Sequence, residues 1–183
     1  MCRRFSWYEP VGLSTSSMHL APQTISLALS IRELIRQGYL FGAKVLIRPF
    51  VERSVTMLYL FHNAEGLVLW NDGWDHKKRP SLQKMFEKLN ESMGILFPSV
   101  QGFTHDFNSA THGDPLSARW NVVIQDGVPV FLASKNLSSP GLADEICAEA
   151  IPWLASAMGM MGAVFPQEND TGAVNRSGDI TVQ

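Results

Sequence analysis

The sequence is poor in charge and in cysteine. Of its 183 residues only 17% are charged, with 15 basic against 17 acidic side chains, which is below the usual quarter. This near-neutral balance of charge does not indicate sequence-independent binding to nucleic acid. The two cysteines, Cys2 and Cys147, are too few for a disulfide framework and fit a reduced, cytoplasmic setting. Cys147 lies inside an apolar helical pattern, so we expect an inert buried thiol.

Several signatures are missing as well. The chain has no phosphate-binding Gly-x-x-x-x-Gly-Lys-Ser/Thr loop, no Gly-x-Gly-x-x-Gly, no His-Glu-x-x-His, no Gly-x-Ser-x-Gly and no Cys-x-x-Cys. The enzyme classes that depend on these motifs are therefore weakened. No apolar run approaches the roughly 20 residues that a membrane span requires, and the start of the chain does not have the pattern of a secretory signal. We expect a cytoplasmic protein without a membrane segment.

Hydrophobic residues make up 45% of the chain, enough to bury a core in a domain of this length. Their spacing predicts an α+β fold, in which an antiparallel sheet of about five strands is covered by helices in the order α-β-β-β-α-β-β-α. We expect an arm over 1–20, one domain over 21–165 and a disordered tail over 166–183. The expected helices are 22–37, 81–93 and 139–161, and the expected strands are 43–48, 55–62, 67–70, 120–124 and 128–132.

Proline and glycine set the expected boundaries. Pro22 suits the first position of a helix, and Gly38 suits the left-handed residue that follows its last turn. Pro49 is expected to end a strand because proline cannot donate to the ladder. Asp126-Gly127 between apolar runs predicts a hairpin turn. Pro152 is expected to bend the last helix.

A polar stretch within the long expected loop 97–117 carries His105, Asp106, His112 and Asp114. Two imidazoles and two carboxylates can ligate zinc or iron. They predict, as an alternative function, a metal-dependent hydrolase with a metal-activated water as nucleophile. The competing interpretation is a solvated loop, because loops collect such residues for their turn chemistry alone.

Aromatic side chains near the expected strand ends and loops are candidates for protein binding. Tryptophan and phenylalanine bury a large area at little cost in entropy, so they often anchor interfaces. The competing interpretation is that they pack the sheet against the helices. These candidates are Trp70, Trp74, Phe103, Phe107 and Trp120.

Basic residues suggest a weaker alternative. Lys77, Lys78 and Arg79, together with Arg3 and Arg4, could bind phosphate or nucleic acid. Three positive charges before a helix are more often a solvated linker, so nucleic acid is an unlikely partner on this evidence.

The stretch Asp126-Gly127-Val128-Pro129-Val130-Phe131-Leu132, which leads through 137–141 into the last helix, resembles the hairpin-then-helix ending of class I type III secretion chaperones and their relatives, including the YbjN-like family. The resemblance covers roughly residues 21–162 at the level of topology. It implies a small, acidic, cytosolic, non-enzymatic binder that is often a homodimer. We therefore predict a protein-binding module, chaperone-like, immunity-like or inhibitor-like, that uses no cofactor and no catalytic residue and binds one protein partner.

Overall fold

A computed structural model describes residues 13–94, 105, 108–112, 115–133 and 135–165. Within these ranges the protein is mostly helical and contains one small antiparallel sheet. The expected five-stranded sheet covered by helices is therefore wrong.

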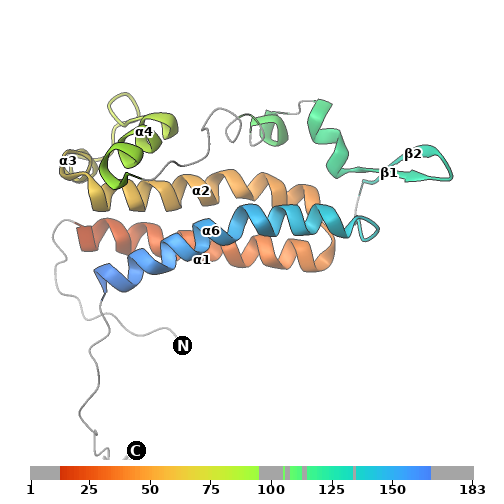
Figure 1. Cartoon of the computed structure of the whole chain (residues 1–183), viewed down its shortest axis with the longest axis horizontal. Coiled ribbons are helices and arrows are strands. Elements are labelled where there is room, and N and C mark those ends of the chain that lie inside the picture. Colours follow the sequence, from red (N-terminus) through yellow and green to blue (C-terminus); the bar gives the residue numbers. More distant parts are fainter. Residues whose placement is uncertain (1–12, 95–104, 106–107, 113–114, 134, 166–183) are drawn as a thin grey trace, which may run out of the picture.

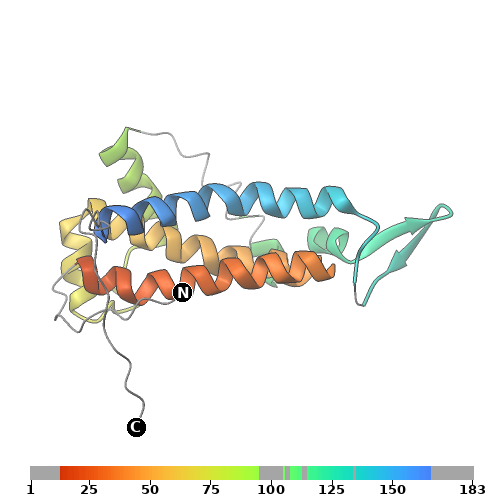
Figure 2. The same ribbon diagram turned by 90° about the horizontal axis from the view of Figure 1, so that it is seen from below.

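Three long helices form the body: α1 (Leu13–Gln37), α2 (Leu40–His62) and α6 (Pro140–Val164). They lie side by side along the long axis of the molecule, and α2 packs against both of the others (Figures 1 and 2). The chain turns back between α1 and α2, so these two are antiparallel, and α6 runs in the same direction as α2. The arrangement is a three-helix bundle.

The reversal between α1 and α2 depends on Gly38, as expected. Its φ of 82° is in the left-handed region that glycine adopts without steric cost. A Cβ at Gly38 would also lie 2.6 Å from Cδ2 of Leu137. The backbone conformation is what requires glycine here, because Leu137 is 74% exposed and the end of its side chain can move aside.

The central helix α2 covers two segments that were expected to be strands, 43–48 and 55–62. Both expectations are wrong for the same reason. Side chains of Ile47, Phe50, Val51 and Val55 are fully buried, since α2 is enclosed by its neighbours over most of its circumference. A helix that is apolar nearly all round loses the polar stripe that separates a helical pattern from a buried strand.

The short helix α3 (Ala64–Asn71) takes the place of the expected strand 67–70. Asn63 begins it by accepting a hydrogen bond from the Gly66 amide at 2.8 Å, a standard N-cap. Gly66 lies against Tyr59 of α2, where an added Cβ would be 2.3 Å from Cε1 of that ring. The cap at Asn63 thus begins a helix where a strand was expected.

The amphipathic helix α4 (Leu82–Met93) agrees with the expected 81–93. The side chain of Ser81 accepts a hydrogen bond from the Lys84 amide, and Gly94 ends the helix with a φ of 62°. Met85, Phe86 and Leu89 are its buried residues. The expectation succeeds here because one face of α4 is polar.

The expected hairpin is also confirmed. After the 3₁₀ helix η1 (Pro115–Trp120), strands β1 (Val122–Gln125) and β2 (Val128–Phe131) pair antiparallel. Asp126 and Gly127 join them with φ values of 52° and 78°, which is the type I′ turn that Asp-Gly favours. The hairpin projects beyond one end of the bundle (Figure 1).

Three prolines lie inside long helices. Pro22 is well within α1, Pro49 is in the middle of α2, and α6 continues through Pro152. Pro22 was expected to begin a helix and Pro49 to end a strand, and both expectations are wrong. Tertiary packing here outweighs the lost backbone hydrogen bond at each proline.

Candidate functional site

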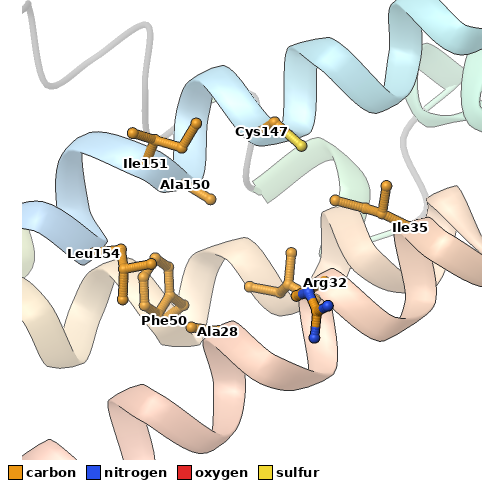
Figure 3. A pocket seen from close by; sticks show the side chains of 9 residues that line it. Ala28, Arg32, Ile35, Phe50, Cys147, Ala150, Ile151 and Leu154 are labelled. Atoms are coloured by element: carbon orange, nitrogen blue, oxygen red, sulfur yellow. The ribbon is translucent and has the colours of Figure 1, made fainter.

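An apolar groove runs between α1 and α6 and has the side of α2 as its floor (Figure 3). It encloses a cavity of about 170 Å³. We call it the α1/α6 groove. Its lining residues are Ala28, Ile31, Arg32, Ile35, Phe50, Cys147, Ala150, Ile151 and Leu154.

The spacing of these residues explains why the groove forms. Its α1 side comes from positions 28, 31, 32 and 35, and its α6 side from positions 147, 150, 151 and 154. Both sets follow the i, i+3, i+4, i+7 pattern of one helix face. Ala28 and Ala150 are too small to fill the space between two long helices, so a cavity is left above Phe50.

One charged side chain, Arg32, lines the groove. It is exposed, and its guanidinium forms no hydrogen bond or ion pair within the described part of the chain. The adjacent acidic residue, Glu33, is engaged elsewhere. Its carboxylate accepts hydrogen bonds from Arg36 at 2.7 Å and from Gln37 at 2.6 Å. These bonds lower the pKa of Glu33 to about 2. Arg32 adds a smaller Coulombic contribution to this lowered pKa, so among the described residues it is an exposed cation near Glu33 that forms no hydrogen bond with it.

The rims of the groove are apolar and open to solvent. Leu29 of α1 is 57% exposed and Ile151 of α6 is 61% exposed. Ile25 of α1 and Met158 of α6 are exposed as well. Exposed apolar side chains near a cavity are typical of a site that binds another molecule.

Cys147 lies in this groove, where a buried thiol was expected, and it is less buried than that expectation. The side chain is half-buried, its thiol is free, and it lines the cavity beside Ile35 (Figure 3). The helical spacing of α6 placed Cys147 on an inward-facing stripe. This spacing could not show that a cavity remains between Cys147 and the facing residues of α1.

A second cluster, of charged residues, joins α2, α6 and η1. The Lys44 side chain is 1% exposed and forms an ion pair with Glu149, whose Oε2 lies 2.6 Å from Nζ. The Lys44 ammonium also lies 5.1 Å from the centre of the Trp120 ring, and Arg119 covers the same ring at 4.8 Å. Arg119 in turn pairs with Glu145 of α6. Every charge here has a partner, so the cluster stabilises the packing of η1 on the bundle.

The aromatic candidates lie in three different places. Trp70 and Trp74 stack with their ring centroids 5.3 Å apart at 54°, and both are partly buried against the core. Trp120 is 2% exposed and belongs to the core cluster. Phe103 and Phe107 lie outside the described residues. The structure brings Trp70 and Trp74 together and places Trp120 elsewhere.

The metal-ligand candidates are only partly described. His105 and His112 are exposed, while Asp106 and Asp114 lie outside the described residues. Across the portion of the chain that the structure describes, no three His, Cys, Asp or Glu side chains gather closely enough to hold a metal ion. The long expected loop is partly helical, with turns at 108–112 and in η1. The metal site stays a prediction.

The basic candidates divide in the same way. Lys77, Lys78 and Arg79 are exposed in the turn after α3, and Arg3 and Arg4 lie outside the described residues. The described basic residues thus have the surroundings of a solvated linker.

Helix α6 is long and apolar enough to cross a membrane by length and composition alone, with a mean hydropathy of 1.2 over its best window, of which 22% is buried. The sequence was expected to contain no such segment. The core helices of soluble proteins share this length and composition.

Comparisons of the chain with protein-family models, with curated proteins and with solved structures find no match.

Proposed function

We propose that the protein is a non-enzymatic protein-binding module, chaperone-like, immunity-like or inhibitor-like, whose α1/α6 groove binds an amphipathic helix of one partner protein. The observation that supports this most directly is the open apolar cavity, which the exposed Arg32 helps to line. The partner chemistry follows from it: apolar side chains for the cavity and a carboxylate for Arg32.

The shape of the groove favours a helix as its occupant. Two neighbouring helices of a bundle leave a straight groove between them. A further helix can pack into this groove in the same way as the existing helices pack against each other. Helix-in-groove recognition uses anchors at i, i+3, i+4 and i+7. A cavity of about 170 Å³ is close in size to one that holds a benzene ring, about 150 Å³, so it suits a leucine or phenylalanine anchor.

The charge gives direction and specificity. Arg32 lies on the α1 side of the cavity, and its guanidinium can form two parallel hydrogen bonds with a carboxylate. A partner helix with an acid one turn from its main anchor gains this pair. A helix with lysine at that position has two like charges in contact, which discriminates against it.

The test uses defined peptides and the full chain. Two fluorescein-labelled helical peptides of about five turns share an apolar stripe of leucines and differ only at one flanking position, Glu or Lys. Fluorescence anisotropy should show tighter binding of the Glu peptide to the wild-type protein. The R32E variant should reverse this preference, and I151D should weaken binding of both peptides about tenfold or more, as expected for a lost apolar anchor.

Val68→Asp is the matched control, because Val68 is 59% exposed and lies on α3, away from the groove. Its affinity for the Glu peptide should equal that of wild type. Equal affinity of wild type for both peptides, or loss of binding in V68D as large as in I151D, would overturn the proposal. So would binding to phosphatidylcholine vesicles with no binding to either peptide, because the apolar α6 would then serve a bilayer.

The metal-dependent hydrolase stays as the alternative, and no described side-chain arrangement favours it over protein binding. Elemental analysis of the purified protein distinguishes the two. A full equivalent of zinc or iron would support the hydrolase, since a real site is expected to be nearly full.

A further inference from the structure

The hairpin β1–β2 has little support from the rest of the molecule. It projects past the end of the bundle (Figures 1 and 2), and three of its apolar side chains are largely exposed: Ile124 at 69%, Val128 at 59% and Phe131 at 76%. An isolated two-stranded hairpin is marginally stable in water, and further strands or a packed helix are needed to stabilise it.

The pairing pattern shows which backbone groups of the hairpin are free. The amide of Leu132 donates to the carbonyl oxygen of Asn121 at 2.6 Å, so these two residues form a hydrogen-bonded pair. In an antiparallel ladder such pairs alternate with pairs whose N–H and C=O groups point away from the partner strand. With the observed register, the outward-pointing pairs are Val122 with Phe131 and Ile124 with Pro129.

The two edges of the hairpin therefore differ. On the outer edge of β2 one of the two outward positions is Pro129, which has no N–H to donate. Proline at this position hinders the addition of a strand to that edge. On the outer edge of β1 both outward residues, Val122 and Ile124, keep their N–H and C=O groups. Strand β1 therefore presents the open edge.

We infer that the β1 edge pairs antiparallel with the β1 edge of a second copy of this chain, joining two hairpins into a four-stranded sheet. The sequence of β1, Val-Val-Ile-Gln, is β-branched and uncharged, so no repulsion opposes self-pairing, and β-branched residues suit strand pairs. The hairpin projects from the end of the bundle (Figure 2), and the exposure of β1 increases from the half-buried Val122 and Val123 to the exposed Ile124 and Gln125.

One register satisfies both outward residues inside the strand. With the two-fold axis at Val123, Val122 of one copy faces Ile124 of the second copy, and each such pair exchanges two hydrogen bonds. The two Val123 residues then face each other as a non-hydrogen-bonded pair with their Cα atoms about 4.5 Å apart. An axis at Val122 or at Ile124 would instead pair strand residues with the turn or with η1.

This dimer uses residues separate from the α1/α6 groove, so it extends the proposed function without depending on it. The first experiment is light scattering coupled to size exclusion of the full chain over a series of concentrations. The wild-type protein should reach twice the 20.3 kDa of one chain. Ile124→Pro removes an outward N–H and no hydrogen bond within the hairpin, so it should give a monomer with an unchanged helical circular dichroism spectrum.

Phe131→Pro is the matched control, because it removes an outward N–H from the β2 edge that Pro129 already blocks. It should remain dimeric. A direct test of the register is V123C in a chain carrying C2S and C147S. Under mild oxidation it should form an intermolecular disulfide, because the expected Cα separation lies within disulfide range. V130C in the same chain, on β2, should not.

A wild-type chain that stays monomeric at its highest soluble concentration would overturn the inference. A dimer that survives I124P, or that I124P and F131P weaken equally, would do the same. A dimer in which V123C fails to cross-link would place the interface elsewhere and would also overturn it. Peptide binding to the groove is read in a separate assay, so failure of one proposal leaves the other standing.

Discussion

Lys44 and Glu149 form an ion pair across the interface of α2 and α6, with 1% and 21% of their side chains exposed. The Lys44 ammonium is held away from water, and Glu149 supplies the carboxylate opposite it. Removing one partner of such a pair leaves an uncompensated buried charge, which is far more costly than the pair itself is stabilising.

We expect Glu149→Ala to lower the free energy of unfolding by about 3–5 kcal/mol, because the Lys44 ammonium loses its carboxylate. The double variant K44M/E149L should recover most of this loss, since apolar side chains of similar volume can replace a buried pair. Urea unfolding followed by circular dichroism measures both. Equal destabilisation in the single and double variants would contradict this account.

Gly66 and Gly159 provide a contrast within the same protein. Alanine is favoured over glycine in a helix by roughly 1 kcal/mol, so Gly159→Ala, with open space around it, should raise stability by up to that amount. Gly66→Ala should lower stability by about 1–3 kcal/mol, the usual cost of overpacking, because the new methyl meets the Tyr59 ring.

The matched experiment repeats Gly66→Ala in a Tyr59→Ala background. There the clash is removed, and the substitution should become neutral or stabilising. If G66A remains as harmful without the Tyr59 ring, the close approach is not the cause.

The Glu33 carboxylate predicts a pH dependence of stability. Its pKa is lowered from 4.5 to about 2, first by the hydrogen bond from Arg36 and then by that from Gln37. A group whose pKa is depressed in the folded state stabilises that state above its unfolded pKa and loses the effect as the pH falls. We expect a small decline in stability between pH 4.5 and pH 2 that is absent in Glu33→Gln. Because Glu33 is exposed to solvent, high salt should reduce the difference.

The alkylation rate of Cys147 can be used to measure occupancy of the α1/α6 groove. In a chain carrying C2S, a bound Glu peptide should slow alkylation of Cys147 by a maleimide, because the occupied cavity covers the thiol. The Lys peptide should protect it less. Mass spectrometry of the alkylated fraction over time measures the effect. Equal protection by both peptides would mean that Arg32 does not select the partner.

The sequence predicted what depends on local chemistry. The left-handed Gly38 and the Asp126-Gly127 turn are fixed by short-range geometry, and both are confirmed. The prediction of a strand over 55–62 was wrong because neither face of α2 is polar in this buried stretch. A local pattern cannot separate a strand buried on both faces from a helix buried all round.

The α1/α6 groove was beyond sequence reasoning for a similar reason. The stripes that carry Ala28 and Ala150 could be found by their spacing, but the cavity depends on how far apart packing on α2 holds the two helices. Arg32 had a weak signal of its own, a cation following an apolar position at the edge of a stripe. That signal could not show that Glu33 is already engaged by Arg36.

The position of Pro129 also bears on how far self-association can go. A hairpin with two open edges could add one molecule after another and grow into a fibre. With one edge closed by a residue that lacks an amide hydrogen, growth stops after the first addition. In the proposed dimer, Pro129 would thus limit the association to two copies.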